Sequence, residues 1–151
     1  MNTTHALKLP ESQPILIVED SPDDFEATKR AFAKANLRNR IQHAESGEEA
    51  LKYLRIDGNP KPGIILLDLN MPGLDGRKTL EIIKQSQNLK TIPVIVLTTS
   101  NDERDVQACY ELGANTYIQK PVDFDGLIAA ILRLKQYWFE IAVLPKDGDN
   151  G

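Results

Sequence analysis

Short runs of consecutive apolar residues recur along the chain, and each is followed by polar residues. Apolar runs of this length, bounded by turn signals, are typical of strands that are buried on both faces. The clearest runs lie at residues 15–18, 64–67 and 94–97, with shorter or weaker ones at 41–44 and 115–118. The pattern therefore predicts a strand at each of these five segments.

Between these runs the apolar residues recur at helical spacing. Helices are predicted at residues 22–35, 47–54, 77–85, 103–112 and 124–138. Ser21 precedes Pro22, and Ser46 precedes Glu49 by three positions, so both serines are favourable helix caps. Gly113 follows the fourth helix and suits a left-handed cap.

Strands that alternate with helices indicate right-handed crossovers and a mostly parallel sheet. The sequence predicts a flavodoxin-like (βα)5 fold, a three-layer α/β sandwich whose five parallel strands lie in the order 2-1-3-4-5. We expect one domain at residues 14–144, with flexible tails at 1–13 and 145–151.

Composition narrows the functional classes. The chain has 151 residues, of which 41% are apolar and 26% charged, as in ordinary soluble domains. A net charge of -4 argues against nucleic-acid binding, which needs a basic surface. No apolar run approaches the length of a membrane span or a signal peptide, so we expect a cytoplasmic protein. Cys109 is the only cysteine, which excludes an intrachain disulfide.

Reactive side chains stand where the predicted strands end. Glu19 and Asp20 follow the first strand, and Asp68 follows the third. In the predicted strand order the switch point lies between these two strands, so the carboxylates are expected to converge there. Thr98 ends the fourth strand, and the fifth leads to Lys120.

This set of residues suits phosphoryl transfer. Three carboxylates at one edge repel one another, and hard oxygen ligands favour Mg²⁺. Asp68 would then attack phosphorus and form an aspartyl phosphate. Charge on the transition state would be stabilised by Mg²⁺, by the Lys120 ammonium and by the Thr98 hydroxyl.

The motifs resemble the receiver domains of two-component response regulators. They are Glu19-Asp20, Asp68 with Met71-Pro72 and Asp75-Gly76, Thr98, Tyr117 and Lys120-Pro121. The resemblance covers about residues 14–135, and no motif position is missing.

The resemblance implies a role for each matching residue. Asp68 is expected to accept a phosphoryl group from the phosphohistidine of a sensor histidine kinase, without the protein being an enzyme that acts on a separate substrate. Asp20 would bind Mg²⁺ directly, Glu19 often through water, and the backbone carbonyl of Asn70 would complete the protein ligands. Thr98 and Tyr117 would form the conformational switch. The family's Lys-Pro bond is usually cis, which implies a cis Lys120–Pro121 bond.

A narrower resemblance concerns the C-terminal part. The segment 137–145, with residues 97–101, is similar to the stand-alone response regulators of bacterial and cyanobacterial phytochromes, which commonly form homodimers. Tyr137, Trp138 and Phe139 form an aromatic cluster that either covers the edge of the domain's own core or contacts a second copy, and we expect the dimer contact.

Two other functions use some of the same residue types, and the sequence fits both poorly. A small Mg²⁺-dependent phosphatase of the haloacid-dehalogenase type also uses an Asp nucleophile, but it usually carries a second Asp two residues later, where this chain has Asn70. A mononucleotide binder needs a phosphate-binding loop after the first strand. Here the corresponding segment, residues 19–24, is acidic and would repel phosphate.

Overall fold

The computed structural model of the chain describes residues 13–69, 75–99 and 102–141, and the side chains of those residues up to 138. The strands are β1 (Ile15–Val18), β2 (Ile41–Ala44), β3 (Ile64–Leu67), β4 (Val94–Thr98) and β5 (Thr116–Gln119). The helices are α1 (Pro22–Lys34), α2 (Gly47–Arg55), α3 (Gly76–Gln85), α4 (Glu103–Glu111) and α5 (Phe124–Leu134), which continues into a π-helix, η2 (Lys135–Ile141).

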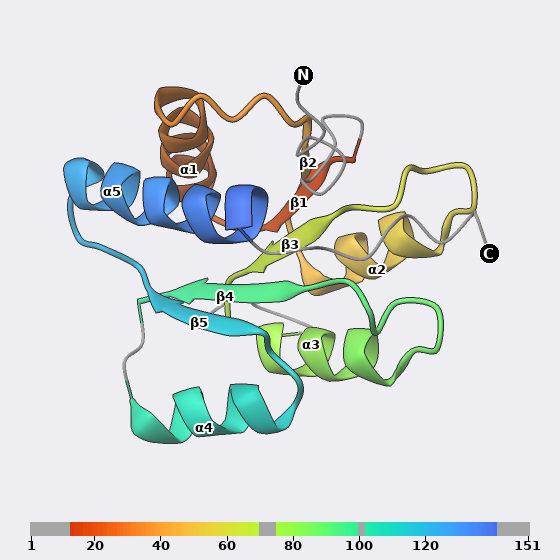
Figure 1. Ribbon diagram of the computed structural model, residues 1–151. Coiled ribbons are helices and arrows are strands. Elements are labelled where there is room, and N and C mark those ends of the chain that lie inside the picture. The colour runs from red at the N-terminus through yellow and green to blue at the C-terminus, as the bar shows by residue number, and fades with distance from the viewer. Residues whose placement is uncertain (1–12, 70–74, 100–101, 142–151) are drawn as a thin grey trace.

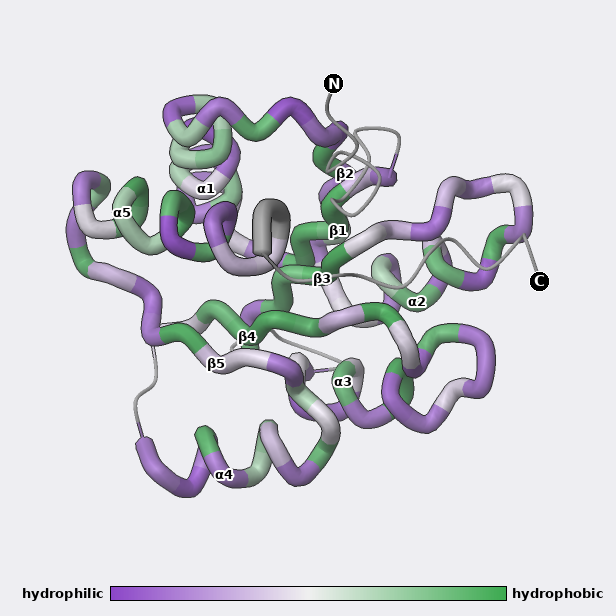
Figure 2. Tube along the Cα trace, viewed as in Figure 1, coloured by the Kyte–Doolittle hydropathy of each residue, from purple (hydrophilic) through white to green (hydrophobic). Residues whose placement is uncertain are grey.

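The strands form one parallel sheet in the order β2-β1-β3-β4-β5, which confirms the predicted fold class and strand order. Helices α1 and α5 cover one face of the sheet, and α2, α3 and α4 cover the other (Figure 1). The central strands β1, β3 and β4 are strongly hydrophobic (Figure 2).

Each face of the sheet has its own apolar core. Alternate residues of a strand point to opposite faces. Accordingly Ile17 and Leu66 pack with Phe32 of α1, whereas Val18 and Leu67 belong to the cluster under α2, α3 and α4. Because β1, β3 and β4 are buried on both faces, the polar groups just beyond their ends lie at the border between core and solvent.

The predicted helix caps are present. The side chain of Ser21 accepts a hydrogen bond from the backbone N–H of Asp24, and that of Ser46 accepts one from Glu49. The expected capping box differs in one respect, because the Glu49 carboxylate accepts from the N–H of Glu45 rather than from Ser46. Gly113 adopts the predicted left-handed conformation, with a φ of 107°.

Several element boundaries differ by one residue from the predictions, and the end of the last helix differs by more. The fifth strand begins and ends one residue later than expected, at Thr116 and Gln119. The last helix is α-helical only to Leu134, and the segment predicted as its final turn has the wider hydrogen-bond spacing of a π-helix. The C-cap residue Lys135 keeps helical dihedral angles, and its ammonium binds the carbonyl of Ala35 at 2.9 Å, which anchors this segment to the end of α1.

The predicted flexible tails lie almost wholly outside the described residues. Gln13 is the exception: it is 8% exposed, and its carbonyl accepts a hydrogen bond from the buried Asn39 side chain at 2.9 Å. Gln13 is therefore packed against the folded domain. In the part of the chain that the structure describes, no helix has the length and apolarity that a membrane crossing requires.

Candidate functional site

Glu19 is held at the end of β1 by its backbone and by both carboxylate oxygens. Its N–H donates to the carbonyl of Ala44, which extends the β1–β2 pairing by one residue. Oε2 accepts from the N–H of Ser21 at 3.2 Å, and Oε1 accepts from the Lys120 ammonium at 2.9 Å. Strand alternation turns this side chain toward the α1 and α5 face, where Asp24 of α1 also contacts the same ammonium at 3.3 Å.

Asp68 lies directly beside Glu19, because β1 and β3 are neighbours in the sheet. Its N–H donates to the carbonyl of Val18 at 3.1 Å, and the residue is only 8% exposed. A methyl group at Gly76 would stand 2.4 Å from the backbone oxygen of Asp68. Glycine at this position therefore allows the start of α3 to pack against the peptide that carries the predicted acceptor.

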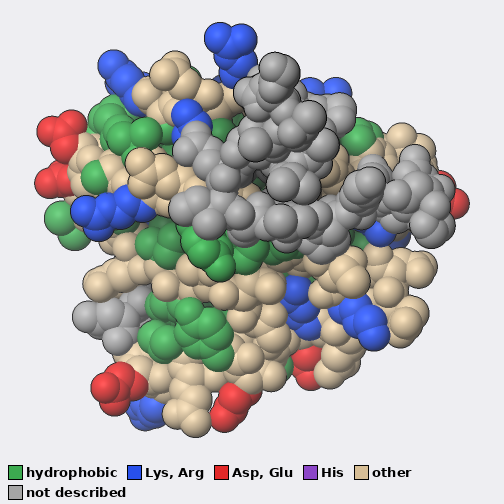
Figure 3. All heavy atoms as spheres, in the orientation of Figure 1, with side chains coloured by type: hydrophobic (Ala, Val, Ile, Leu, Met, Phe, Trp, Pro, Cys, Tyr) green, Lys and Arg blue, Asp and Glu red, His purple; other side chains and the backbone are tan. Residues whose placement is uncertain are grey.

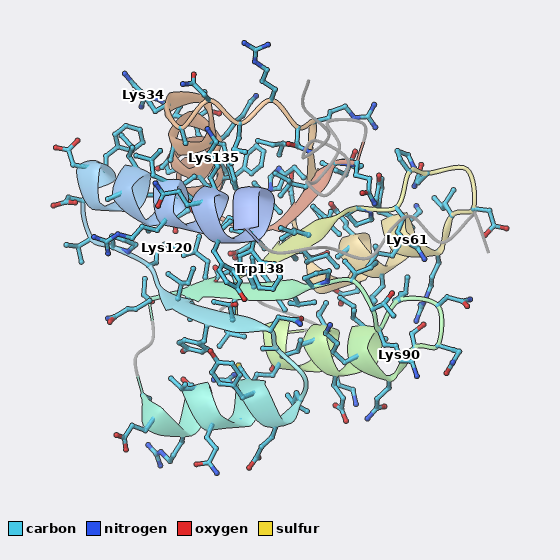
Figure 4. The ribbon with its side chains drawn as sticks, viewed as in Figure 1. Lys34, Lys61, Lys90, Lys120, Lys135 and Trp138 are labelled. Atoms are coloured by element: carbon cyan, nitrogen blue, oxygen red, sulfur yellow. The ribbon has the colours of Figure 1, made fainter. Side chains whose placement is uncertain are left out.

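Thr98 and Lys120 are brought to the same edge by the ends of β4 and β5. The N–H of Lys120 donates to the carbonyl of Thr98 at 2.6 Å, and Thr98 is fully buried. The Lys120 side chain, 10% exposed, then reaches across to Glu19, which precedes it by 101 positions. Figure 4 shows Lys120 at this end of the molecule, beside the start of α5.

Tyr117 lies on the edge strand β5, where it pairs with Val96 of β4. It is half-buried and packs against the cluster beneath α2, α3 and α4. Its backbone N–H donates to the phenol oxygen of Tyr110 on α4 at 3.2 Å. The predicted switch residue is thus in contact with both the core and α4.

The electrostatics of the site show an excess of negative charge. Burial raises the pKa of Glu19 to about 7, and the charge of Asp68 adds to this rise, while Lys120 opposes it. Burial alone would lower the pKa of Lys120, but the hydrogen bond to Glu19 and the charges of Glu19, Asp68 and Asp24 raise it overall. The rise for Glu19 thus comes chiefly from burial, whereas the rise for Lys120 comes from the carboxylates around it, which favour a cation beside them.

The donor set fits a hard divalent cation. Glu19, Asp20 and Asp68 each offer a carboxylate oxygen, and these oxygens lie within 4.8 Å of one another. Glu19 and Asp68 are buried, whereas Asp20 is more exposed. Oxygen ligands with partial access to water are those that Mg²⁺ prefers, and its charge would relieve the repulsion among them.

Two predicted site features lie outside the described residues, and the predicted cis peptide bond is not present. Asn70, the predicted carbonyl ligand, lies outside the described residues, and so does the side chain of Phe139. The expectation of a cis Lys120–Pro121 bond is wrong for this structure, in which no described peptide bond is cis. The free-energy difference between the isomers of an X–Pro bond is only about 0.5–1 kcal/mol, so the sequence does not fix the choice.

Sequence reasoning missed several residues that support the site. Asp24 enters the sequence analysis only as part of the acidic segment 19–24, and in the structure it contacts the Lys120 ammonium. His43 has no role in the sequence prediction, and its Nε2 lies 2.8 Å from the carbonyl oxygen of Glu19. Gly76 is one of the predicted motif residues, but the motif does not reveal its close approach to the Asp68 peptide. These contacts join segments far apart in sequence, and no local pattern signals them.

The aromatic residues of the C-terminal segment divide between core and surface. Trp138 is half-buried and packs against the cluster beneath α1 and α5, and it lies under the end of α5 (Figure 4). Tyr137 is 53% exposed and meets the Trp138 ring edge-on at 5.2 Å. Both rings line a groove of about 560 Å³ together with Ile118 and Leu134. Hydrophobic side chains gather on this face of the molecule (Figure 3).

Comparison with known proteins supports the same assignment. Residues 15–132 match the response regulator receiver domain family. The chain is 39% identical to the response regulator Rcp1 of Synechocystis sp. over 142 residues, which cover 89% of this chain and 97% of Rcp1.

Solved structures of relatives are similar throughout. The Mn²⁺-bound form of Rcp1 superimposes with a TM-score of 0.81, covering 89% of this chain and 99% of Rcp1 at 38% identity. The phosphorylated cyanobacterial phytochrome response regulator RcpA gives a TM-score of 0.83 at 36% identity, with the same coverage. The bacteriophytochrome response regulator AtBRR gives 0.70 at 41% identity, covering 91% of this chain and all (100%) of AtBRR.

The fold and the acidic edge of the sheet define a receiver domain. The chain belongs to the response regulator receiver family, and its relatives include response regulators of phytochromes.

Proposed function

We propose that this protein is a single-domain response regulator that accepts a phosphoryl group on Asp68 in a Mg²⁺-dependent reaction. The observation that carries the proposal is the convergence of Glu19, Asp20 and Asp68 with the Lys120 ammonium at the β1–β3 switch point. The similarity to a Mn²⁺-bound and to a phosphorylated regulator supports it.

In the proposed reaction an oxygen of Asp68 forms a bond to phosphorus. The bond from phosphorus to the donor breaks, and the leaving group, the kinase histidine or acetate from a small donor, keeps the electron pair. Mg²⁺, held by Asp20, Asp68 and Glu19, would neutralise the charge that develops on the phosphoryl oxygens.

The protein's own residues supply the remaining stabilisation. The carboxylates around Lys120 offset the effect of burial on its pKa, which favours the charged ammonium beside Asp68. It would exchange its contact with Glu19 for one with the phosphoryl group. Thr98, buried at the end of β4, would donate its hydroxyl hydrogen to the same group, and Tyr117 would follow this movement. The protein is then a phosphoacceptor that catalyses its own modification and its slow reversal.

The similarity to phytochrome response regulators suggests the partner. We propose a sensor histidine kinase, specifically a phytochrome, as the phosphoryl donor. We place the reaction in the cytoplasm, where ATP is available to such a kinase.

Intact-mass spectrometry after incubation with acetyl phosphate tests the chemistry. Wild type should gain one phosphoryl group with Mg²⁺ and none after chelation, and Asp68→Asn should gain none under either condition. Asp75→Asn is the matched control, because Asp75 caps α3 through Lys78. An adduct retained in Asp68→Asn would identify another acceptor, and no adduct on wild type with either acetyl phosphate or a phytochrome kinase would contradict the proposal.

We further propose that the groove beside Tyr137 and Trp138 is a homodimer contact. Two observations support this contact. Tyr137 is exposed, and the edge strand β5, whose Ile118 lines the same groove, has one side unpaired in the described sheet. Tyr137→Ala and Trp138→Ala should lower the mass measured by sedimentation toward that of a monomer. Leu132→Ala, which changes a 40% exposed side chain of α5 that does not line the groove, should leave it unchanged. A wild type that sediments as a monomer at all concentrations would contradict the contact.

A further inference from the structure

The peptide that joins Glu19 to Asp20 is bound from the neighbouring strand by His43. Nε2 of His43 lies 2.8 Å from the carbonyl oxygen of Glu19. A carbonyl oxygen only accepts hydrogen bonds, so Nε2 carries the proton and donates it. The N–H of Glu19 meanwhile donates to Ala44, the residue after His43. The end of β2 therefore holds Glu19 at both its N–H and its C=O.

The imidazole is itself fixed by an aromatic neighbour. The rings of His43 and Phe25 stack with their centroids 3.6 Å apart and their planes within 4°. Phe25 lies in the first turns of α1, the helix that begins just after the acidic pair, and it packs against the core beneath α1 and α5. The stack restricts rotation of the imidazole, so its N–H stays directed at the Glu19 carbonyl.

The hydrogen bond from His43 affects the orientation of Asp20. The Glu19 carbonyl and the Asp20 N–H belong to one planar peptide unit, so a bond to the carbonyl orients the plane from which Asp20 departs. Glu19 is also fixed through both carboxylate oxygens, by Ser21 and Lys120, and Asp20 is more exposed than either buried carboxylate. Asp20 therefore depends more than Glu19 on the orientation of this peptide.

We propose that His43, supported by Phe25, is a positioning residue that presets the acidic pair for cation binding. The inference rests on the proposed function of the site. Groups that orient metal ligands without touching the metal often matter nearly as much as the ligands themselves. His43 acts here through the main chain of one ligand residue, and its effect does not require it to contact the cation.

Three variants distinguish the effect of the His43 N–H donor from the effect of its ring and from a general loss of stability. His43→Phe keeps a flat ring for the stack and removes the donor. His43→Gln restores an N–H donor at a similar distance from the backbone. Ile41→Val trims a half-buried side chain on the same face of β2, two residues away, and leaves the His43 bond in place.

Mn²⁺ affinity, measured from the free-ion electron paramagnetic resonance signal, is the first readout. His43→Phe should raise the Kd about tenfold, His43→Gln should recover most of this loss, and Ile41→Val should bind as wild type does. An unchanged Kd in His43→Phe, no recovery in His43→Gln, or an equal loss in Ile41→Val would overturn the inference. A wild type that binds no Mn²⁺ would instead overturn the proposed function on which it rests.

A measurement on the wild type keeps the test independent of variants that fail to fold. The chain has only two histidines, His5 and His43, so nitrogen-15 NMR of the imidazoles is simple to assign. The inference requires a His43 that carries a proton on Nε2, with a resonance that shifts during Mg²⁺ titration. A His43 protonated on Nδ1 alone, or a resonance unaffected by saturating Mg²⁺, would overturn it.

Discussion

The two ends of the β-sheet each hold a lysine that is largely withdrawn from solvent, and the two are opposite in electrostatic character. At the carboxyl end, the Lys120 ammonium contacts the carboxylates of Glu19 and Asp24. At the amino end, the Lys84 ammonium binds the main-chain carbonyls of Lys90 and Ile92 at 3.1 and 2.8 Å. Figure 4 shows Lys90 at the end of the molecule opposite Lys120.

The pKa values of these lysines follow their partners. Burial lowers the pKa of Lys84, because neutral carbonyl groups replace water without supplying a counter-charge. The pKa of Lys120 is raised despite burial, because several carboxylates surround it. The comparison shows that burial of a lysine alone does not mark a reactive site. The Lys120 end differs from the Lys84 end in the several carboxylates that the fold holds close together.

Removal of each lysine should give the largest contrast between the two ends. Lys120→Met is expected to slow phosphorylation by acetyl phosphate about 10²- to 10³-fold, the usual cost of removing one donor to developing charge. Lys84→Met is expected to leave the rate unchanged and to lower only the free energy of unfolding. The measurements are single-turnover phosphorylation rates and urea unfolding of both variants. Equal rates in the two variants would contradict the assignment of Lys120.

Substitution of Asp20, the more exposed acid at the carboxyl end of the sheet, should have the next largest effect. Asp20→Asn is expected to weaken Mg²⁺ binding by at least about tenfold, because even groups that only support metal ligands commonly contribute about 10- to 100-fold. Isothermal titration calorimetry of Mg²⁺ measures the change. Asp23→Asn, which alters a neighbouring acid in the first turn of α1, is the control for a general loss of negative charge. If both variants bind alike, Asp20 is not a ligand.

A substitution at the amino end should affect stability alone. Gly113 has a φ of 107°, and an added Cβ would stand 2.8 Å from Cγ of Lys84. Gly113→Ala should lower the free energy of unfolding by about 1–2 kcal/mol from backbone conformation alone, without changing the rate of phosphorylation. Gly58→Ala is the matched control, because its Cβ would meet no atom within 4 Å. Equal stability of the two variants would show that Lys84 and the backbone adapt freely.

The smallest expected effect is on the pH dependence of stability. In the folded protein the pKa of Lys84 lies below its ordinary value of 10.5, so the unfolded chain binds a proton more readily in the interval between the two. The free energy of unfolding of wild type, relative to Lys84→Met, should therefore rise as the pH increases through that interval toward 10.5. Urea unfolding of both proteins from neutral pH to pH 10.5 measures the difference. A difference that falls with pH would show that Lys84 gains a counter-charge on folding.

The sequence by itself determined the elements and the reactive residue types. The apolar runs at β1, β3 and β4 are nearly continuous because a strand buried on both faces excludes polar side chains from either side. Serine caps and Gly113 mark helix ends because their local backbone geometry is intrinsic to those residues. The alternation of strands and helices predicted the strand order. That order in turn predicted that Glu19, Asp20 and Asp68 lie close together.

The tertiary structure alone decided how those residues are held. The contacts of Lys120 with Asp24, of His43 with Glu19 and of Gly76 with the Asp68 peptide join segments that only the folded sheet brings together. The change from α- to π-helix after Leu134 likewise has no local signal, because it occurs where Lys135 and Trp138 pack against other elements. Local patterns report what each segment does by itself, whereas pKa values, ring stacking and close backbone approach depend on distances between segments, which the sequence does not contain.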